Sequence, residues 1–238
     1  MSITLGARVY KNINRPSGEA MKQFEGIPSS NIGDYCNRLY CSNGTLRAFN
    51  DKMLLGPAFT VKVPAGDNLL IHLALDLAQE GDVLVIDGAG MTDRSLLGEM
   101  MIIYAEKRKL GGIVVDGAIR DSDYASRAGI PIYAAGVTPQ GPYKNGPGEI
   151  NVPVCCAGQV VMPGDIIAGD ADGIVVIHPE QVDELAAIAQ KKMAGEIEQR
   201  GTTADGSYLI KHREQFEKAT EKAGVILLDE AFQQSRWG

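Results

Sequence analysis

The chain has 238 residues, of which 45% are hydrophobic and 22% are charged, close to the averages of folded proteins. This length suits a single domain with extensions, and the composition does not resemble that of a disordered chain. The net charge of −7 argues against a nucleic-acid surface as the main function. A small anionic ligand would therefore need a local positive pocket.

No apolar run approaches the roughly 18 residues of a membrane span, and the N-terminus lacks the apolar core of a secretory signal. We therefore expect a cytoplasmic protein without membrane contact. The four cysteines form no disulfide framework or zinc pattern, and the three histidines lie far apart. Any metal would then be held by carboxylates.

The first third of the chain predicts short helices followed by a strand and a longer helix. Residues 16–32 have near-helical spacing, and a second short helix is expected over 32–39. Alternation predicts a strand over 54–63. Asp67 then caps a helix whose leucines recur with a period near 3.6 and which closes at Gly81.

A buried strand over Val83–Ile86 leads into a glycine-rich exit at Asp87–Gly90, which has neither a P-loop nor a complete dinucleotide motif. A helix is expected over Leu96–Leu110, with Gly98 and Glu99 near its start. Amides in the first turn of a helix have no intrahelical acceptor and lie at the positive end of its dipole. The amides near Glu99–Met101 are therefore candidates to hold a carboxylate.

The next strand, Ile113–Val115, ends in Asp116-Gly117 and is followed by Arg120 and Asp121 side by side. An arginine offers a planar fork of donors to a carboxylate, and an aspartate offers hard oxygen to a divalent metal. The alternative interpretation is an ordinary solvated loop pair, since exposed ion pairs are common and weak.

The remaining sequence predicts a β-rich layer and two terminal helices. After a strand at Ile130–Tyr133, the proline- and glycine-rich segment Thr138–Glu149 is expected to be a functional surface loop. Short strands follow up to Ile177. One helix is expected from Pro179 to about Arg200, and another over Lys211–Lys222.

Because carboxyl ends of parallel strands share a rim, we expect Asp87–Gly90, the helix start at Gly98-Glu99, and Arg120-Asp121 to meet there. Three blocks of sequence around these positions resemble one family, the RraA-like proteins, which include the 4-hydroxy-4-methyl-2-oxoglutarate/4-carboxy-4-hydroxy-2-oxoadipate aldolases. The blocks are GDVLVIDGAG, GEMMIIYAEKRKLGGIVVDGAIRD and MPGDIIAGDADGIVVIHPEQVDEL.

The resemblance covers residues 57–185 and implies an α/β fold with a layered β/β/α sandwich core. It further implies a homo-oligomer, either a trimer or a hexamer of paired trimers. We expect one RraA-like domain over residues 1–238, with a core at about 54–185 and helical arms at 1–53 and 186–238.

The resemblance also implies roles for individual residues. Arg120 would bind the carboxylate of pyruvate, and Asp121 would ligate Mg²⁺ or Mn²⁺ directly. The backbone of Gly98, Met100 and Met101 would hold the substrate.

Two further acids would act on the metal through water. Glu99 would contact metal-bound water, and Glu196, with Glu198 as the second candidate, would come from the C-terminal helix of a neighbouring subunit. By contrast, Asp170 and Asp172 of the DxDG turn suit capping better than metal binding.

The implied activity is a divalent-metal-dependent (class II) lyase of 2-oxo acids, which cleaves a 4-hydroxy-2-oxo diacid or decarboxylates oxaloacetate to pyruvate. No lysine lies at the centre of this set of predicted site residues, which disfavours a Schiff-base aldolase. Two positions depart from the aldolase pattern, which prefers aspartate at Glu99 and an acid at Tyr124. The alternative is therefore a non-catalytic RraA-type regulator that binds ribonuclease E.

Overall fold

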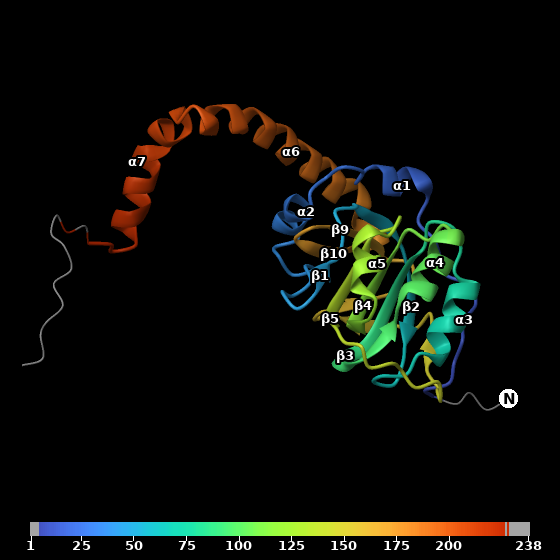
Figure 1. The fold of residues 1–238 in the computed structure, drawn as a ribbon. Helices are drawn as coiled ribbons and strands as arrows, with labels where there is room; N and C mark the ends of the chain where they lie inside the picture. Colours follow the sequence, from blue (N-terminus) through green and yellow to red (C-terminus); the bar gives the residue numbers. More distant parts are fainter. Residues whose placement is uncertain (1–4, 227, 229–238) are drawn as a thin grey trace, which may run out of the picture. The chain divides into compact units, whose positions relative to one another are not determined.

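An eight-stranded sheet forms the centre of residues 5–193 (Figure 1), with strand order β1-β5-β4-β3-β2-β9-β10 and β6 paired to β2. Strands β2 to β5 are mutually parallel, whereas β1, β6, β9 and β10 run antiparallel to their neighbours. The strands are β1 (Arg47–Ala48), β2 (Leu54–Lys62), β3 (Val83–Leu97), β4 (Gly112–Ile119), β5 (Ile132–Val137), β6 (Glu149–Ile150), β9 (Ile166–Asp170) and β10 (Gly173–Ile177), with a separate hairpin of β7 (Val154–Cys156) and β8 (Gln159–Val161).

This computed structural model describes residues 5–226 and 228. The chain divides into two compact units, residues 1–193 and 194–238, and the boundary falls within helix α6 (Val182–Ala204). The predicted arms at 1–53 and 186–238 thus include residues 1–4, 227 and 229–238, which lie outside the described part.

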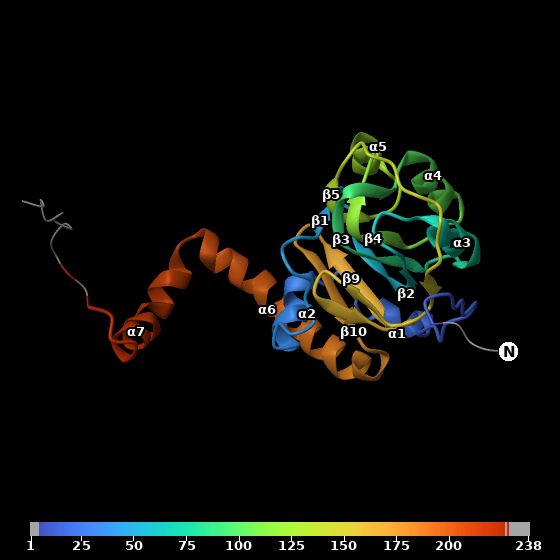
Figure 2. The ribbon, with the colours of Figure 1, turned by 90° about the horizontal axis from the view of Figure 1, so that it is seen from below.

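Three helices follow successive parallel strands and cover one face of the sheet (Figure 2). They are α3 (Leu69–Leu77), α4 (Glu99–Lys107) and α5 (Ser122–Arg127). The other helical elements of this unit are α1 (Gly18–Lys22), α2 (Ser29–Tyr35), a 3₁₀ turn at Pro179–Gln181 and the beginning of α6.

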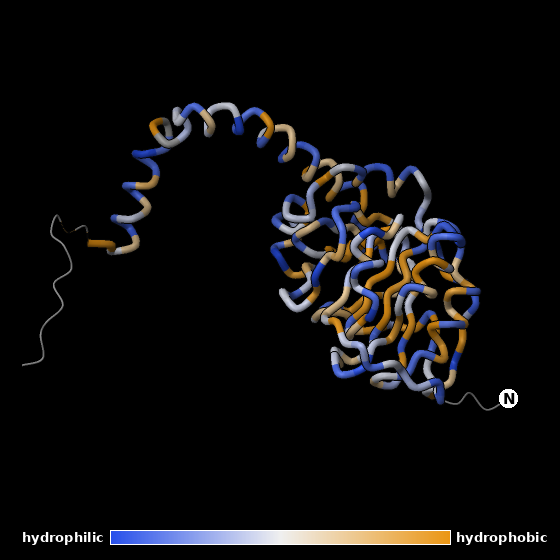
Figure 3. The backbone as a smooth tube through the Cα atoms, viewed as in Figure 1, coloured by the Kyte–Doolittle hydropathy of each residue, from blue (hydrophilic) through white to orange (hydrophobic). Residues whose placement is uncertain are grey.

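Alternation along the strands separates two of the apolar clusters in the core. Leu84 and Ile86 belong to the cluster that faces α3 and α4, whereas Val83 and Val85 belong to the cluster shared with β9 and β10. A third cluster packs α1, α2 and α6 against the far side of β9 and β10. Figure 3 shows the hydrophobic residues concentrated in these central strands. The predicted layered β/β/α core is confirmed.

Strand β3 is much longer than the predicted Val83–Ile86. The chain passes through the expected exit at Asp87–Gly90 and stays paired with β4 up to Leu97, with register shifts after Asp87. Left-handed backbone at Ala89 (φ 60°) and Gly90 (φ 66°) absorbs the extra residues as an irregularity rather than a turn. The predicted helix over 96–110 consequently begins only at Glu99.

Other boundaries also differ from the predictions. Strand β4 does not end at Asp116-Gly117 but continues to Ile119. Helix α2 covers Ser29–Tyr35 rather than 32–39, because Pro28 precedes its first turn, where a fixed φ is tolerated. The predicted turn role of Asp170 is confirmed, since its carboxylate accepts hydrogen bonds from Ser29 N and Asp172 N.

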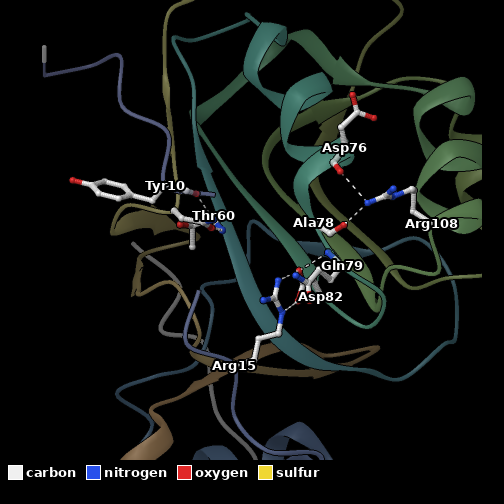
Figure 4. A network of polar contacts seen from close by, with 9 residues as sticks. Tyr10, Arg15, Thr60, Asp76, Ala78, Gln79, Asp82 and Arg108 are labelled. Atoms are coloured by element: carbon white, nitrogen blue, oxygen red, sulfur yellow. Dashed lines mark hydrogen bonds and ion pairs between the residues drawn. The ribbon is translucent and has the colours of Figure 1, made fainter. Parts of the chain in front are cut away.

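A buried ion pair joins the N-terminal segment to the sheet (Figure 4). Arg15 Nε and Nη2 donate to the two carboxylate oxygens of Asp82 at 2.8 and 2.7 Å, and Gln79 N donates to the same carboxylate. The Asp82 side chain is fully buried, whereas Arg15 is about one quarter exposed. Removing the arginine would leave the carboxylate buried with only its backbone donor.

We predict that Arg15→Ala lowers the free energy of unfolding by about 3 kcal/mol, measured by urea denaturation, because a buried charge loses its partner. The exposed pair Arg127–Asp123 offers a matched control, and Arg127→Ala should cost less than about 1 kcal/mol. Equal effects of the two substitutions would contradict this account.

The second unit contains the end of α6 and helix α7 (Ser207–Lys222). Helix α6 continues to Ala204, past the predicted end at Arg200. On α7, the rings of Tyr208, His212 and Phe216 stack at helical spacing. No helix among the described residues is sufficiently long and apolar to span a membrane.

Candidate active site

Arg120 and Asp121 lie where two neighbouring parallel strands end. Strand β4 ends at Ile119, and Arg120 N donates to Leu97 O at 3.0 Å, which ties this point to the end of β3. Asp121 then adopts a left-handed conformation (φ 55°, ψ 46°), which is uncommon for a residue other than glycine. Both side chains are partly exposed. Strained backbone of this kind is frequent at functional sites.

Asp121 also caps helix α4, which begins one residue after Gly98. Gly98 offers no side chain, and Glu99 N instead donates to Asp121 Oδ2 at 2.9 Å. The same oxygen lies 3.5 Å from Arg120 Nε. The arginine, the aspartate and the helix start therefore form one connected group, as predicted from the sequence.

One amide of the first turn is open to a ligand. Met101 N and Ile102 N both donate to Gly98 O, so the Met101 amide that we expected to bind substrate already has an acceptor. In the described part of the chain, Met100 N has no such acceptor. Met100 N–H, at the positive end of α4, is thus the available backbone donor beside Arg120.

A cavity of about 370 Å³ opens at this helix start. Its wall includes Gly98, Met100, Met101 and Arg120 from the predicted site. A second cavity of about 320 Å³ also has Arg120 in its wall, together with Asp121. The predicted third member, Asp87–Gly90, is not part of either wall and instead lines a separate cavity of about 520 Å³ with Asp116 and Cys155. Of the three segments expected to meet, the helix start and the Arg120-Asp121 pair lie together, whereas Asp87–Gly90 does not join them.

Four polar residues of the 370 Å³ cavity were not predicted from the sequence, namely Asn68, His72, Ser95 and Lys144. Asn68 is 3% exposed, and among the described residues its Oδ1 has no hydrogen-bond partner. Burial and the nearby charge of Lys144 lower the pKa of His72, which favours the neutral imidazole. The loop carrying Lys144 was predicted to be functional from its proline and glycine content, but no residue in it was singled out.

Tyr124, which departs from the aldolase pattern, belongs to neither cavity wall. Its hydroxyl donates to Glu106 Oε2 at 2.9 Å, and this bond raises the pKa of the phenol, so Tyr124 stays neutral. The neighbouring Asp123 is exposed and pairs with Arg127. Position 124 therefore supplies no anionic oxygen, and any metal must rely on other ligands.

The carboxylates at the rim fit a hard divalent cation that retains much of its water. In the described part of the chain, the contacts of the Asp121 carboxylate all use Oδ2, which leaves Oδ1 for a cation. Among the described residues, no group of three or more His, Cys, Asp or Glu side chains is placed so that it could hold a metal ion by itself. Mg²⁺ commonly binds through one or two carboxylates together with waters and substrate oxygens, so this donor set suits it.

Glu196 and Glu198 lie on α6 in the second unit. Their expected role requires a neighbouring subunit, so it stays a prediction.

At the ends of its parallel strands, this layered β/β/α chain brings together a guanidinium, an open helix amide and a carboxylate. These groups are suited to holding an anion beside a divalent cation. The chain belongs to the RraA-like family, whose family model, described as Aldolase/RraA, matches residues 29–176.

Relatives within this family have different names. A protein of Halalkalibacterium halodurans, provisionally named a 4-hydroxy-4-methyl-2-oxoglutarate aldolase, is 37% identical over 190 residues, which cover 79% of this chain and 90% of the relative. Streptomyces coelicolor RraAS2, described as an unusual member of the RNase ES inhibitor RraA family, has a TM-score of 0.68 and 29% identity, with coverage of 79% of this chain and 99% of that structure. The RNA-processing inhibitor RraA from Thermus has a TM-score of 0.57 and 28% identity, covering 63% and 91%.

Proposed function

We propose that this chain is a cytoplasmic, divalent-metal-dependent lyase of 2-oxo acids. It cleaves a 4-hydroxy-2-oxo diacid in a retro-aldol reaction, or decarboxylates oxaloacetate, and releases pyruvate through an enolate. The observation that carries the proposal is the open amide of Met100 beside Arg120. Asp121 connects the two, because its carboxylate contacts both the start of α4 and the Arg120 guanidinium. The name of the Halalkalibacterium relative supports the same reaction class.

The substrate carboxylate next to the keto group binds to the guanidinium of Arg120 and to Met100 N–H. A two-point contact from the guanidinium fixes the plane of this carboxylate, and the dipole of α4 adds favourable charge. Lys144 also lines the cavity that contains these donors, and its ammonium donates hydrogen bonds to the second carboxylate of a diacid.

The C3–C4 bond breaks as the C4 hydroxyl loses its proton, leaving a carbonyl on one product and the enolate of pyruvate on the other. The buried Oδ1 of Asn68, which has no partner in the described residues, accepts the hydrogen bond of that hydroxyl. In this proposal the carboxylate of Glu99, the first residue of α4, takes up the proton; Glu99 adjoins Gly98 and Met100 of the cavity wall but is itself part of neither wall.

Mg²⁺ or Mn²⁺, held by Asp121 with Glu99 nearby, would supply Lewis-acid stabilisation for the developing enolate charge. We further propose a homo-oligomer, a trimer or hexamer, in which Glu196 of a second copy completes this shell. Size-exclusion chromatography with light scattering checks the assembly, and Glu196→Gln checks the contribution of its carboxylate.

The proposal is tested by coupled pyruvate detection with 4-hydroxy-4-methyl-2-oxoglutarate and with oxaloacetate, in Mg²⁺ and after chelation by EDTA. We expect pyruvate release that stops with EDTA and returns with added Mg²⁺ or Mn²⁺. Release that is indifferent to EDTA would refute the metal-dependent mechanism, and no release from either substrate would refute the lyase.

The second candidate is a regulator that binds ribonuclease E, and the names of two solved relatives, an RNA-processing inhibitor and a member of the RNase ES inhibitor family, support a function of this kind. The neutral Tyr124 in place of an acid favours this alternative, because it removes one oxygen ligand from the rim. Inhibition of ribonuclease E by the purified protein, without any pyruvate release, would support the regulator over the lyase.

A further inference from the structure

The segment Gln140–Lys144, which we call the strap, forms one side of the candidate active site. Gly141, Pro142 and Lys144 line the 370 Å³ cavity together with Arg120. A methyl group added at Gly141 would lie 3.5 Å from Arg120 Nη1, so the strap backbone packs directly beside the guanidinium. A shift of the strap would therefore change the cavity on the side that carries Lys144.

Arg94, near the end of β3, holds the strap with its side chain. Its guanidinium lies 4.1 Å from the centre of the Tyr143 ring, and Nη1 donates to Gly141 O at 3.0 Å. When the side-chain amide of Gln140 is oriented so that both its oxygen and its nitrogen form hydrogen bonds, Arg94 Nη2 donates to that oxygen at 3.1 Å. One guanidinium thus contacts three residues of the strap through two hydrogen bonds and a cation–π contact.

The backbone around Arg94 is shaped to allow these contacts. Gly66 has φ 73°, and a side chain there would come within 2.9 Å of Arg94 Cδ. Ser95 N and Oγ both donate to Gln140 O, and Gly66 O accepts from Tyr143 N. These backbone anchors fix the course of the strap, while Arg94 adds the side-chain contacts on both sides of Pro142.

Arg94 itself is not part of the wall of either cavity next to Arg120. Arg94 therefore acts on the cavity indirectly, and through the strap it acts on Lys144, the residue that follows Tyr143. Arg120 and Lys144 are the two cationic residues in the wall of this cavity, and Lys144 belongs to the strap.

We propose that Arg94 is a positioning residue for the second carboxylate of a diacid, acting through the strap that carries Lys144 into the cavity of Arg120. The inference rests on the proposed function for the identity of the substrate. It does not require catalysis, because it concerns how the site distinguishes an anion with two carboxylates from an anion with one.

The experiment measures binding of 2-oxoglutarate, a diacid, and of pyruvate, a monoacid, to the full chain in Mg²⁺ by calorimetry. For Arg94→Gln we expect the Kd of 2-oxoglutarate to rise about tenfold, equivalent to about 1.4 kcal/mol, and the Kd of pyruvate to change less than about twofold. In turnover of oxaloacetate, KM should rise by a similar factor while kcat stays nearly constant. An unchanged Kd for the diacid, or an equal loss for both ligands, would overturn the inference.

Two variants of Tyr143 separate the role of the strap from a general loss of folding. Tyr143→Leu removes the ring under the guanidinium and should reproduce the selective loss of diacid binding, whereas Tyr143→Phe keeps the ring and should bind like the wild type. Trypsin cleavage after Lys144 should accelerate in Arg94→Gln and Tyr143→Leu only. Equal cleavage in all four proteins would overturn the inference.

The two proposals can fail separately. A wild type that binds 2-oxoglutarate with the expected dependence on Arg94, but releases no pyruvate, would refute the proposed lyase and support the role of Arg94. A wild type that releases pyruvate, with diacid binding insensitive to Arg94 and Tyr143, would do the reverse.

Discussion

Arg120→Ala is expected to lower kcat/KM for pyruvate release by about 10²- to 10³-fold, because charge-assisted hydrogen bonds to a carboxylate contribute about 1.5–3 kcal/mol each. The guanidinium borders both cavities at the site, and its backbone amide joins the ends of β3 and β4. The backbone bond survives the substitution, so the loss should come from substrate binding and orientation rather than from unfolding.

Arg120→Lys serves as a matched variant, because it keeps the charge and removes the fork. We expect it to recover only part of the activity, since a single ammonium cannot fix the plane of the substrate carboxylate. Steady-state kinetics checks both variants, and circular dichroism checks that they fold. Activity of Arg120→Ala within about threefold of the wild type would contradict the assigned role, because so small a change is worth well under one hydrogen bond.

Gly98→Ala should inactivate the site almost as strongly, by about 10²-fold or more, through displacement of two functional groups. An alanine methyl group at this position would lie 2.4 Å from Asp121 Oδ2 and 2.8 Å from Arg120 Cγ. Gly98 has an extended backbone (φ −152°, ψ −165°) that any residue adopts, so the added methyl group causes no backbone strain of its own. The effect is therefore steric and confined to the site.

Stability should change little in Gly98→Ala. Loss of the contact between Asp121 and Glu99 N, which caps α4, should cost about 1 kcal/mol in urea denaturation. Gly44→Ala is the control, because no atom lies within 4 Å of its added methyl group and its activity should match the wild type. An active Gly98→Ala would show that Asp121 and Arg120 can rearrange freely, contrary to the connected group described here.

The layered core was predictable because it depends on local patterns. Alternation in β2 indicates a strand, the apolar runs of β3 and β4 indicate parallel strands buried on both faces, and glycine and proline mark most of their ends. The length of β3 was not predictable, since the backbone at Ala89 and Gly90 resembles a turn in sequence yet is accommodated within the strand by pairing with β4. Local composition cannot distinguish these two outcomes.

The Arg120–Asp121 rim could be inferred from its position after a strand, together with the family resemblance. The cap that Asp121 provides for α4 joins residues 22 positions apart, and only the folded chain brings them together. Asn68 and Lys144 were missed for the same reason, because one precedes a helix and the other lies in a loop that reaches the cavity from elsewhere. The buried Oδ1 of Asn68 points to a ligand only once the folded structure shows that this atom has no hydrogen-bond partner among the described residues.

The central claim is that Arg120, Asp121 and the start of α4 bind the anion and the cation at one site. Linkage makes this testable: if the ligands interact, pyruvate must tighten Mn²⁺ binding by the same factor by which Mn²⁺ tightens pyruvate binding. Mn²⁺ titration followed by electron paramagnetic resonance, with and without pyruvate, measures this factor in the wild type and in Asp121→Asn. We predict clear mutual tightening in the wild type and weak, pyruvate-independent Mn²⁺ binding in Asp121→Asn. A Mn²⁺ affinity that changes neither with pyruvate nor with the Asp121→Asn substitution would contradict this role for the site.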